Sequence, residues 1–342
     1  MDELDVTTRI EELCAEAAAR PPRTGLLAPT RDVEGSDAPE AVAARVHAHA
    51  VIFAGAGRAA LLQLLHPWVA AGVREHSVVT TDPLGRFRRT FSGVLAMLFG
   101  EPPIAAQSAR EVAAIHARIF GRLPDDAGAF RAGTAYAALD RSALRWVHAT
   151  LLDTSLRMYA LLVRPLTGAE RAACYAQSRR FAGMFGLRER DLPEDIERFE
   201  VYFEAMCDGP ILGASDATRE LARGLFLPHS RALEPAFAVY RRLTGVWLPP
   251  RLRTEIGLPA PTRVDRLVER VAVATLRTQR RWPRTLRLLP AYLRARERAL
   301  GEPMPALSRW IERALFVAEP GRPAPAQASP PTRELPIQVT PR

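Results

Sequence analysis

Helix boundary signals recur along most of this chain, and they constrain its fold more than any other feature. Asp140 precedes a long periodic segment that ends before Pro165, and Thr167-Gly168-Ala169-Glu170 forms a capping box. No hairpin signal and no set of alternating β-branched strands is evident. The sequence therefore predicts an all-α fold built as a single multi-helix domain.

Further boundary signals divide the chain into helices. Asp82-Pro83 predicts an N-cap with proline at N1, and Gly100 marks the end of that helix. Ser108-Ala109-Arg110-Glu111 predicts a capping box that opens a helix running to about Phe120. Pro193 is expected to start a helix that continues to about Met206. Helical patterns also occupy 216–226, 235–244, 263–281 and 286–300.

The stretch VIFAGAGRAALLQLLHP, residues 51–67, contains the pattern G-x-G-x-x-A, which is typical of a dinucleotide-binding turn. That fold requires alternating strands and helices, and none follow here. Asp82 stands at the distance of the acidic ribose ligand, but it is better explained as a helix cap. We therefore expect one apolar helix, or two helices broken at the glycines, where small residues allow a backbone or a flat ligand to approach closely.

Composition divides the chain into three parts. Residues 1–40 are expected to form an N-terminal arm that is partly helical or flexible, and residues 41–317 the helical domain. Residues 318–342 are rich in proline and lack a periodic apolar pattern, which predicts a disordered tail.

The number and distribution of charged residues indicate which classes of binding partner to expect. The net charge is +9, and every basic residue is arginine, which a GC-rich genome would explain. The arginines are interspersed with acidic residues, and no basic-aromatic motif appears, so nucleic-acid binding is not expected. The N-terminus is acidic, and residues 51–73 carry Arg58, Gln63 and His66, so neither a signal peptide nor a transmembrane anchor is predicted. The three cysteines are far apart, and a cytoplasmic location is expected.

The histidines are isolated rather than grouped in a metal-binding motif. No H-E-x-x-H, no Glu-x-x-His and no C-x-x-C-H occurs, so zincin, di-iron and covalent haem sites are excluded. Helical spacing places His116 on one face with Val112, Ile119 and Leu123. His116 is then either a hydrogen-bonded core histidine or the axial ligand of a haem, whose porphyrin supplies the other four nitrogens. His148 and His66 are similar candidates.

A second candidate feature is the segment DPLGRFRRTF, where Arg86 and Thr90 are separated by one helical turn. Arginine near a helix N-terminus opposes the helix dipole unless an anion is close. Arg86 and Arg89 therefore either lie on a solvated basic turn or face a carboxylate or phosphate.

Five segments together resemble the MpaB-type oxygenases, a family that includes the rubber oxygenase. They are GRAALLQLLHPWVAAGVREHS, DPLGRFRRTF, IHARIFG, YAALDRSALRWVHATLLDT and LTGAERAACYAQSRRFAGMFG, and they follow in the family's order across roughly residues 45–250. The resemblance implies a helical, globin-like core that binds non-covalent haem b, whose iron and dioxygen cleave carbon–carbon double bonds of isoprenoid chains.

The resemblance also implies residue roles. His116 matches the family's axial haem ligand and is therefore the expected metal-binding residue. Arg86 and Thr90 match the family's R-x-x-x-T pair beside the haem, and His66, His76 and His148 match histidines of its motifs. The rubber oxygenase has a lysine directly before the motif threonine, which can cap the distal iron face. Arg89 stands there in this chain, and because arginine does not deprotonate it cannot ligate iron.

These inferences predict a haem-dependent oxygenase of a small apolar substrate. In it, Arg86 and Arg89 hold propionates or polarise bound oxygen, Thr90 donates a hydrogen bond, and His148 is a further catalytic candidate. Two alternatives stay open: a non-catalytic haem or apolar-ligand carrier with the same fold, and a basic helical nucleic-acid binder.

Overall fold

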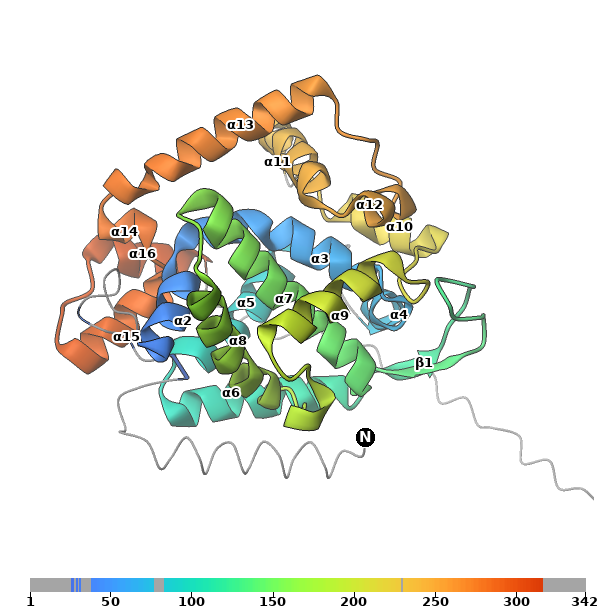
Figure 1. Ribbon diagram of the computed structural model, residues 1–342, viewed down its shortest axis with the longest axis horizontal. Coiled ribbons are helices and arrows are strands. Elements are labelled where there is room, and N and C mark those ends of the chain that lie inside the picture. The colour runs from blue at the N-terminus through green and yellow to red at the C-terminus, as the bar shows by residue number, and fades with distance from the viewer. Residues whose placement is uncertain are drawn as a thin grey trace, which may run out of the picture.

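The chain is almost entirely helical in the computed structural model, which describes residues 26, 27, 29, 31, 38–76, 83–228 and 230–315 (Figure 1). The longer helices are α2 (Pro39–Ala48), α3 (Ala56–Leu64), α4 (Pro67–His76), α5 (Pro83–Phe99), α6 (Pro102–His116), α7 (Arg141–Leu162), α8 (Gly168–Gly183), α9 (Ile196–Asp208), α10 (Asp216–Gly224), α11 (Glu234–Trp247), α13 (Arg263–Arg277), α15 (Pro290–Leu300) and α16 (Ala306–Leu315). Shorter helical segments are η1 (Ala50–Gly55), η2 (Glu189–Asp191), η3 (Arg231–Leu233), α12 (Pro250–Glu255), η4 (Thr278–Arg281) and α14 (Arg284–Arg287). The predicted all-α single domain is confirmed.

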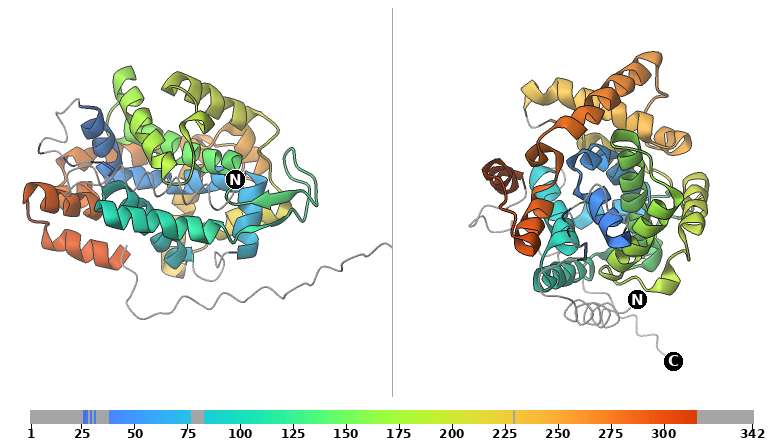
Figure 2. Two further views of the ribbon diagram at one scale, coloured as in Figure 1. Left: turned by 90° about the horizontal axis from the view of Figure 1, so that it is seen from below. Right: turned by 60° about the vertical axis from the view of Figure 1, so that its left-hand side comes forward.

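The centre of the molecule is formed by η1 and α3, which α7 covers along its length (Figure 1). Helices α10 and α11 pack on another side of α3, and α2 is held between α7 and α8. One large cluster of buried apolar side chains, including Trp146 and Tyr159 of α7, joins these elements. Helix α5 packs on α6 and on α15, at the side of this centre (Figure 2).

The glycine-rich stretch is a break between two helices. Segment η1 ends at Gly55, and α3 begins at Ala56. A Cβ at Gly55 would lie 2.5 Å from Thr154 Cγ2, and a Cβ at Gly57 would lie 2.9 Å from Thr244 Oγ1. The glycines thus allow close packing against α7 and α11. Of the two predicted alternatives, one apolar helix or two helices broken at the glycines, the structure has the second, and the glycines of the motif serve helix packing.

Two predicted helix starts are confirmed in atomic detail. The side chain of Asp140 accepts hydrogen bonds from the backbone N–H groups of Ser142 and Ala143 at the start of α7. Thr167 and Glu170 form the reciprocal capping box of α8. Each cap satisfies backbone donors that the helix itself leaves without partners, which is why such signals can be found from sequence.

Other predicted boundaries are wrong. Helix α6 begins at Pro102, so Ser108 lies inside it rather than at its cap, and it ends at His116 rather than near Phe120. Ile119 and Leu123 are therefore not on the helical face of His116. Helix α9 begins after Asp195, whose side chain accepts from Arg198 N–H, and not at Pro193. The predicted cap Asp82 lies outside the described residues.

A short antiparallel hairpin follows α6, although no hairpin was expected. Strand β1 (Phe120–Arg122) pairs with β2 (Ala135–Ala137), with Gly121 opposite Tyr136. The Tyr136 hydroxyl donates to Glu75 Oε2 at 2.7 Å, which joins the hairpin to α4. Strands of three residues are too short to produce a recognisable alternation, which explains why the sequence did not reveal them.

Part of the N-terminal arm is packed on the domain. Leu27 is buried, and its backbone N–H donates to the carbonyl of Leu98 at the end of α5. The Pro-rich tail predicted for 318–342 lies outside the described residues.

In the described part of the chain, no single helix has the length and apolar character needed to cross a membrane. One pair, Ala50–Leu64 with Pro67–Glu75, has them only when taken together, and it bends by 100° at its break.

Candidate functional site

The α5–α6 pair brings two predicted site residues to one end of a helical hairpin. Only Gly100 and Glu101 separate the two helices, and the helices pack along each other. Two helices joined by so short a connection run antiparallel, so the last turn of α6 lies level with the first turn of α5. His116 ends α6, and Arg86 is in the first turn of α5. Residues 30 apart in sequence therefore share one end of the hairpin.

Three residues of the first turns of α5 lie in line along the helix. Arg86, Thr90 and Gly93 follow the spacing of one helical face. The side chain of Arg86 lies outside the described residues, whereas the side chains of Arg89 and Thr90 are exposed. A Cβ built on Gly93 would meet no atom within 4 Å, so there is open space beside this turn of α5.

His116 is half-buried at the C-terminal end of α6. Burial lowers the pKa of its imidazole to about 4. Across the described residues, its side chain has no hydrogen-bond or ion-pair partner. At neutral pH the ring is therefore uncharged and has a nitrogen lone pair that no described protein group uses.

His148 has a different environment in the middle of α7. It is 3 % exposed, and its Nε2 lies 3.0 Å from the carbonyl oxygen of Ser178 on α8. A carbonyl only accepts, so Nε2 carries the proton and donates it. Burial is the main reason that the pKa of His148 falls to about 4; the hydrogen bond to Ser178 opposes this shift, and nearby His47 contributes to it. The structure thus turns the side chain of His148 toward α8.

His66 lies between α3 and α4 and is buried against the rings of Trp68 and Phe130. Its Nδ1 has no hydrogen-bond partner, and burial lowers its pKa to about 4. His66 directly precedes the first residue of α4. Near the other end of α4, Glu75 accepts a hydrogen bond from Tyr136 of the β1–β2 hairpin, which follows His116. His66 and this hydrogen bond are therefore at opposite ends of α4. The side chain of His76 lies outside the described residues.

A protein-only metal site is not found in the described part of the chain, where no group of three or more His, Cys, Asp or Glu side chains converges.

A buried ion-pair network around Arg58 was not predicted from the sequence. Arg58 is 1 % exposed, and its Nη2 lies 2.6 Å from Asp153 Oδ2. The same guanidinium donates to Thr154 Oγ1 at 2.6 Å and to the Trp247 carbonyl at 2.9 Å. Burial lowers the pKa of Arg58, and the charge of Asp153 opposes that shift. The network joins α3, α7 and α11.

A second network ties α2 to α8. Arg45 is fully buried and forms an ion pair with Glu170, the capping-box residue of α8. Arg164 also pairs with Glu170, and the hydrogen bonds hold the pKa of that carboxyl down to about 2. We call the packed set of α2, α3, α7 and α8 the closed core, because its buried charges are paired within the protein.

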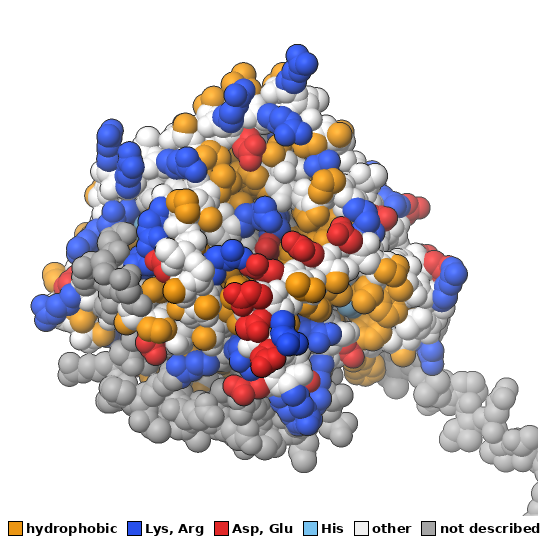
Figure 3. All heavy atoms as spheres, viewed as in Figure 1, with side chains coloured by type: hydrophobic (Ala, Val, Ile, Leu, Met, Phe, Trp, Pro, Cys, Tyr) orange, Lys and Arg blue, Asp and Glu red, His pale blue; other side chains and the backbone are white. Residues whose placement is uncertain are grey.

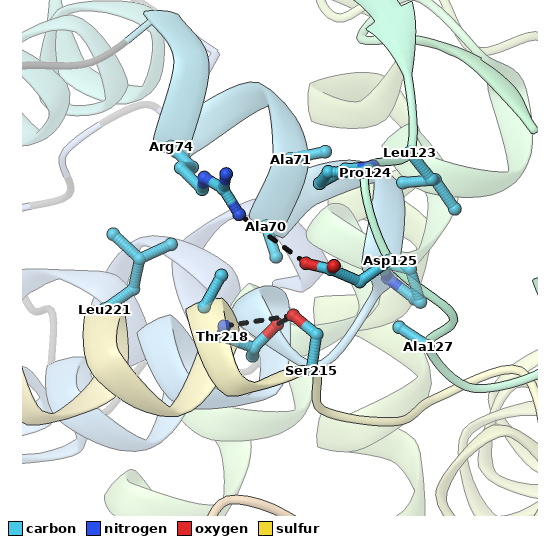
Figure 4. Close-up of a pocket in the computed structure, with 12 residues that line it drawn as sticks. Ala70, Ala71, Arg74, Leu123, Pro124, Asp125, Ala127, Ser215, Thr218 and Leu221 are labelled. Atoms are coloured by element: carbon cyan, nitrogen blue, oxygen red, sulfur yellow. Dashed lines mark hydrogen bonds and ion pairs between the residues drawn. The ribbon is translucent and has the colours of Figure 1, made fainter. Parts of the chain in front are cut away.

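A pocket lies at another place, between α4, the loop after β1 and α10 (Figure 4). Arg74 and Asp125 face each other across its mouth, with Arg74 Nη1 3.7 Å from Asp125 Oδ2. None of the predicted site residues lines it. The lining residues are Pro67, Ala70, Ala71, Arg74, Leu123, Pro124, Asp125, Ala127, Ser215, Ala217, Thr218 and Leu221.

Comparison with known proteins gives one match. Residues 44–278 match the model of a family described as ER-bound oxygenase mpaB/B'/Rubber oxygenase, catalytic domain. The match includes α3, α7 and α8, the second half of α2 and the α5–α6 hairpin. No curated protein and no solved structure matches the chain.

Proposed function

The chain belongs to the mpaB and rubber oxygenase catalytic-domain family, and from this we propose that it is a haem b-dependent oxygenase in which His116 would hold the haem iron. Its co-substrate is dioxygen and its substrate is a small apolar molecule. The observation that carries the proposal is the state of His116: a neutral imidazole, partly removed from water and without a described protein partner.

The residues present fit a haem. An axial ligand must offer a nitrogen lone pair, and the low pKa of His116 keeps that lone pair free of a proton at neutral pH. A flat cofactor also needs space, and Gly93 on the neighbouring helix borders a region that no atom within 4 Å fills. Porphyrin nitrogens would supply the other ligands, which the described side chains do not provide as a cluster.

His148 fits the ligand role less well than His116. Its Nε2 proton is donated to the Ser178 carbonyl, so only Nδ1 could ligate without breaking a buried hydrogen bond, whereas both ring nitrogens of His116 are without a described protein partner. We therefore assign His148 to holding α7 on α8. His66 keeps an unpartnered Nδ1 and is a residue that could contact the cofactor's edge.

A bound haem would supply iron-centred activation of dioxygen. The chain's own residues would bind and orient the reactants around it. His116 would hold the iron, while Arg86 and Arg89, at the N-terminal end of α5, would neutralise anionic carboxylates. The Thr90 hydroxyl, one helical turn after Arg86, would donate a hydrogen bond on the same face. Half-buried apolar side chains of the α5–α6 hairpin, such as Val94 and Val112, would exclude water from an apolar substrate.

The test is haem binding by the full chain. Expressed with excess haem, the wild-type protein should show a Soret band corresponding to about one haem per chain. His116→Gly should lose at least about nine-tenths of that band, and added imidazole should restore it. His148→Gln is the matched control, because glutamine can still donate to the Ser178 carbonyl, and it should retain the haem.

Circular dichroism of each variant separates loss of the ligand from loss of the fold. If His116→Gly keeps its haem while His148→Gln loses it, His148 is the ligand and the assignment is overturned. A folded wild-type protein without a Soret band and without iron would overturn the haem proposal itself. Oxygen consumption with apolar alkene substrates then separates an oxygenase from a haem carrier.

A further inference from the structure

Helix α13 exposes an apolar stripe that the domain does not cover. Val264, Leu267 and Val271 are each more than half exposed, and exposed Ala274 continues the same stripe. Their spacing of three and four residues places them on one helical face. The opposite face, with Val268, Ala272 and Leu276, packs against the main core. The exposed stripe is therefore not needed to hold α13 on the domain.

A stripe of arginines runs directly beside these apolar residues. Arg263, Arg266 and Arg270 follow the neighbouring helical face and are exposed. In the described structure none of the three has an ion pair or a side-chain hydrogen bond, and the same holds for Arg280 and Arg281 just after α13. Five positive charges on one segment thus stay uncompensated by the protein.

The charge of the molecule is concentrated in this segment. Residues 263–287 contain eight arginines and two acidic residues, a net charge of +6 out of +9 for the whole chain. The two acidic residues are engaged within the protein, Asp265 with Arg242 and Glu269 with the Trp247 indole N–H. Figure 3 shows arginine and apolar side chains together over the α13 end of the molecule, whereas acidic side chains gather across its middle.

We propose that this face, which we call the α13 face, docks the protein on the surface of an anionic lipid bilayer. Bilayers of this kind offer negative headgroups for the arginines and an acyl boundary for the aliphatic stripe, at the same depth. Nucleic acid would neutralise the arginines but would give Val264, Leu267 and Val271 nothing apolar to contact. Helix α13 lies at the outer edge of the molecule, so it can meet a flat surface (Figure 1).

The proposal is tested by sedimentation of the full-length protein with vesicles. Vesicles of phosphatidylcholine containing about one-third phosphatidylglycerol should bind the protein, and pure phosphatidylcholine vesicles should bind it at least about 10-fold more weakly. Binding should weaken as salt is raised, because exposed charges are screened.

Two double variants test the two stripes separately. Arg266→Gln with Arg270→Gln should weaken binding by about 30-fold, since each interfacial arginine accounts for about a factor of 5. Leu267→Ser with Val271→Ser should weaken it by at least about 5-fold. The charge-matched control is Arg190→Gln with Arg198→Gln, and the apolar control is Val201→Ser with Ile211→Ser. These four residues are also exposed but lie elsewhere, and the controls should bind within about 2-fold of the wild type.

Three results would overturn the proposal. The first is no binding to the anionic vesicles at low salt, and the second is binding that the α13 variants leave unchanged. The third is a different partner for the face: duplex DNA bound more tightly than vesicles and lost in the arginine variant, or a dimer in solution that the Leu267/Val271 variant dissociates. All variants are surface changes, and their thermal unfolding should match the wild type within the error of the measurement.

Discussion

The closed core and the α5–α6 hairpin differ in the hydrogen-bond partners of their polar side chains. In the closed core, Arg58 is bound by three protein groups, and His148 donates to a carbonyl of the next helix. In the hairpin, His116 has no such partner among the described residues, and Thr90 is exposed. A half-buried, neutral imidazole that has no described protein partner keeps its nitrogen lone pair available to a ligand.

The two regions are also expected to respond differently to substitution, one through the stability of the fold and the other through cofactor binding. Substitutions in the closed core should cost free energy of unfolding, because they leave a buried partner without its hydrogen bond or its counter-charge. Substitutions at the end of the α5–α6 hairpin that carries Arg86 and His116 should leave the free energy of unfolding nearly unchanged and should weaken cofactor binding instead.

The largest expected effect is that of Arg58→Met. It removes the counter-charge of Asp153 and two further hydrogen bonds, and it should reduce the free energy of unfolding by about 3 kcal/mol. The control is Arg74→Met, whose guanidinium is 45 % exposed and lies 3.7 Å from Asp125, and which should cost less than about 1 kcal/mol. Urea unfolding measures both. Equal losses for the two variants would mean that the Arg58 network contributes no more than a surface pair.

A smaller effect concerns the pH dependence of stability. Burial lowers the pKa of His148 to about 4 in the folded state, below its ordinary value of 6.5. As the pH falls below 6.5 the unfolded state takes up a proton that the folded state resists, so stability present at pH 7 is lost toward pH 4. Between pH 7 and pH 5 this amounts to about 2 kcal/mol for His148 alone.

His148→Gln removes the titration and can keep the hydrogen bond to Ser178. We therefore expect urea unfolding to show a loss between pH 7 and pH 5 that is about 2 kcal/mol smaller in this variant than in the wild type. Burial also lowers the pKa of His47, so His47 contributes to the pH dependence of stability in both proteins. The contribution of His148 is therefore the difference between the wild-type and variant pH profiles. Parallel pH profiles would show that His148 does not stay neutral in the fold.

The same substitution at two threonines gives the smallest effects and the most direct comparison. Thr154 is 4 % exposed and accepts from Arg58 Nη1, so Thr154→Val should cost about 1–2 kcal/mol. Thr90→Val changes an exposed side chain and should alter the stability of the haem-free protein by less than about 0.5 kcal/mol. Thermal unfolding measures the stabilities, and haem titration of Thr90→Val shows whether its hydroxyl acts on the cofactor. A large loss of stability in Thr90→Val would mean that the Thr90 hydroxyl supports the fold, as that of Thr154 does, and would contradict this prediction.

Local signals in the sequence were sufficient where the structure depends on neighbours in the chain. Asp140 and Thr167 cap helices through hydrogen bonds to residues two or three positions ahead, and both were found from sequence. Ser108 has the same kind of signal, yet it lies inside α6. Pro102 and Pro103 already start that helix, and packing along α5 extends it through Ser108. A capping pattern thus predicts a possible start, and the tertiary contacts decide whether it is used.

The amino-acid sequence by itself determined the helical class and the family segments, because these depend on residue type and short spacing. Spacing left His116, His148 and His66 as similar candidates, and the resemblance to the family singled out His116. Only the tertiary structure decided which histidine nitrogens the protein already uses, since Ser178 is 30 residues from His148. It also decided that Arg58 pairs with Asp153, 95 residues away, and that one face of α13 stays uncovered. Such pairings arise from helices packing side by side, and no local pattern encodes which distant side chain will be the neighbour.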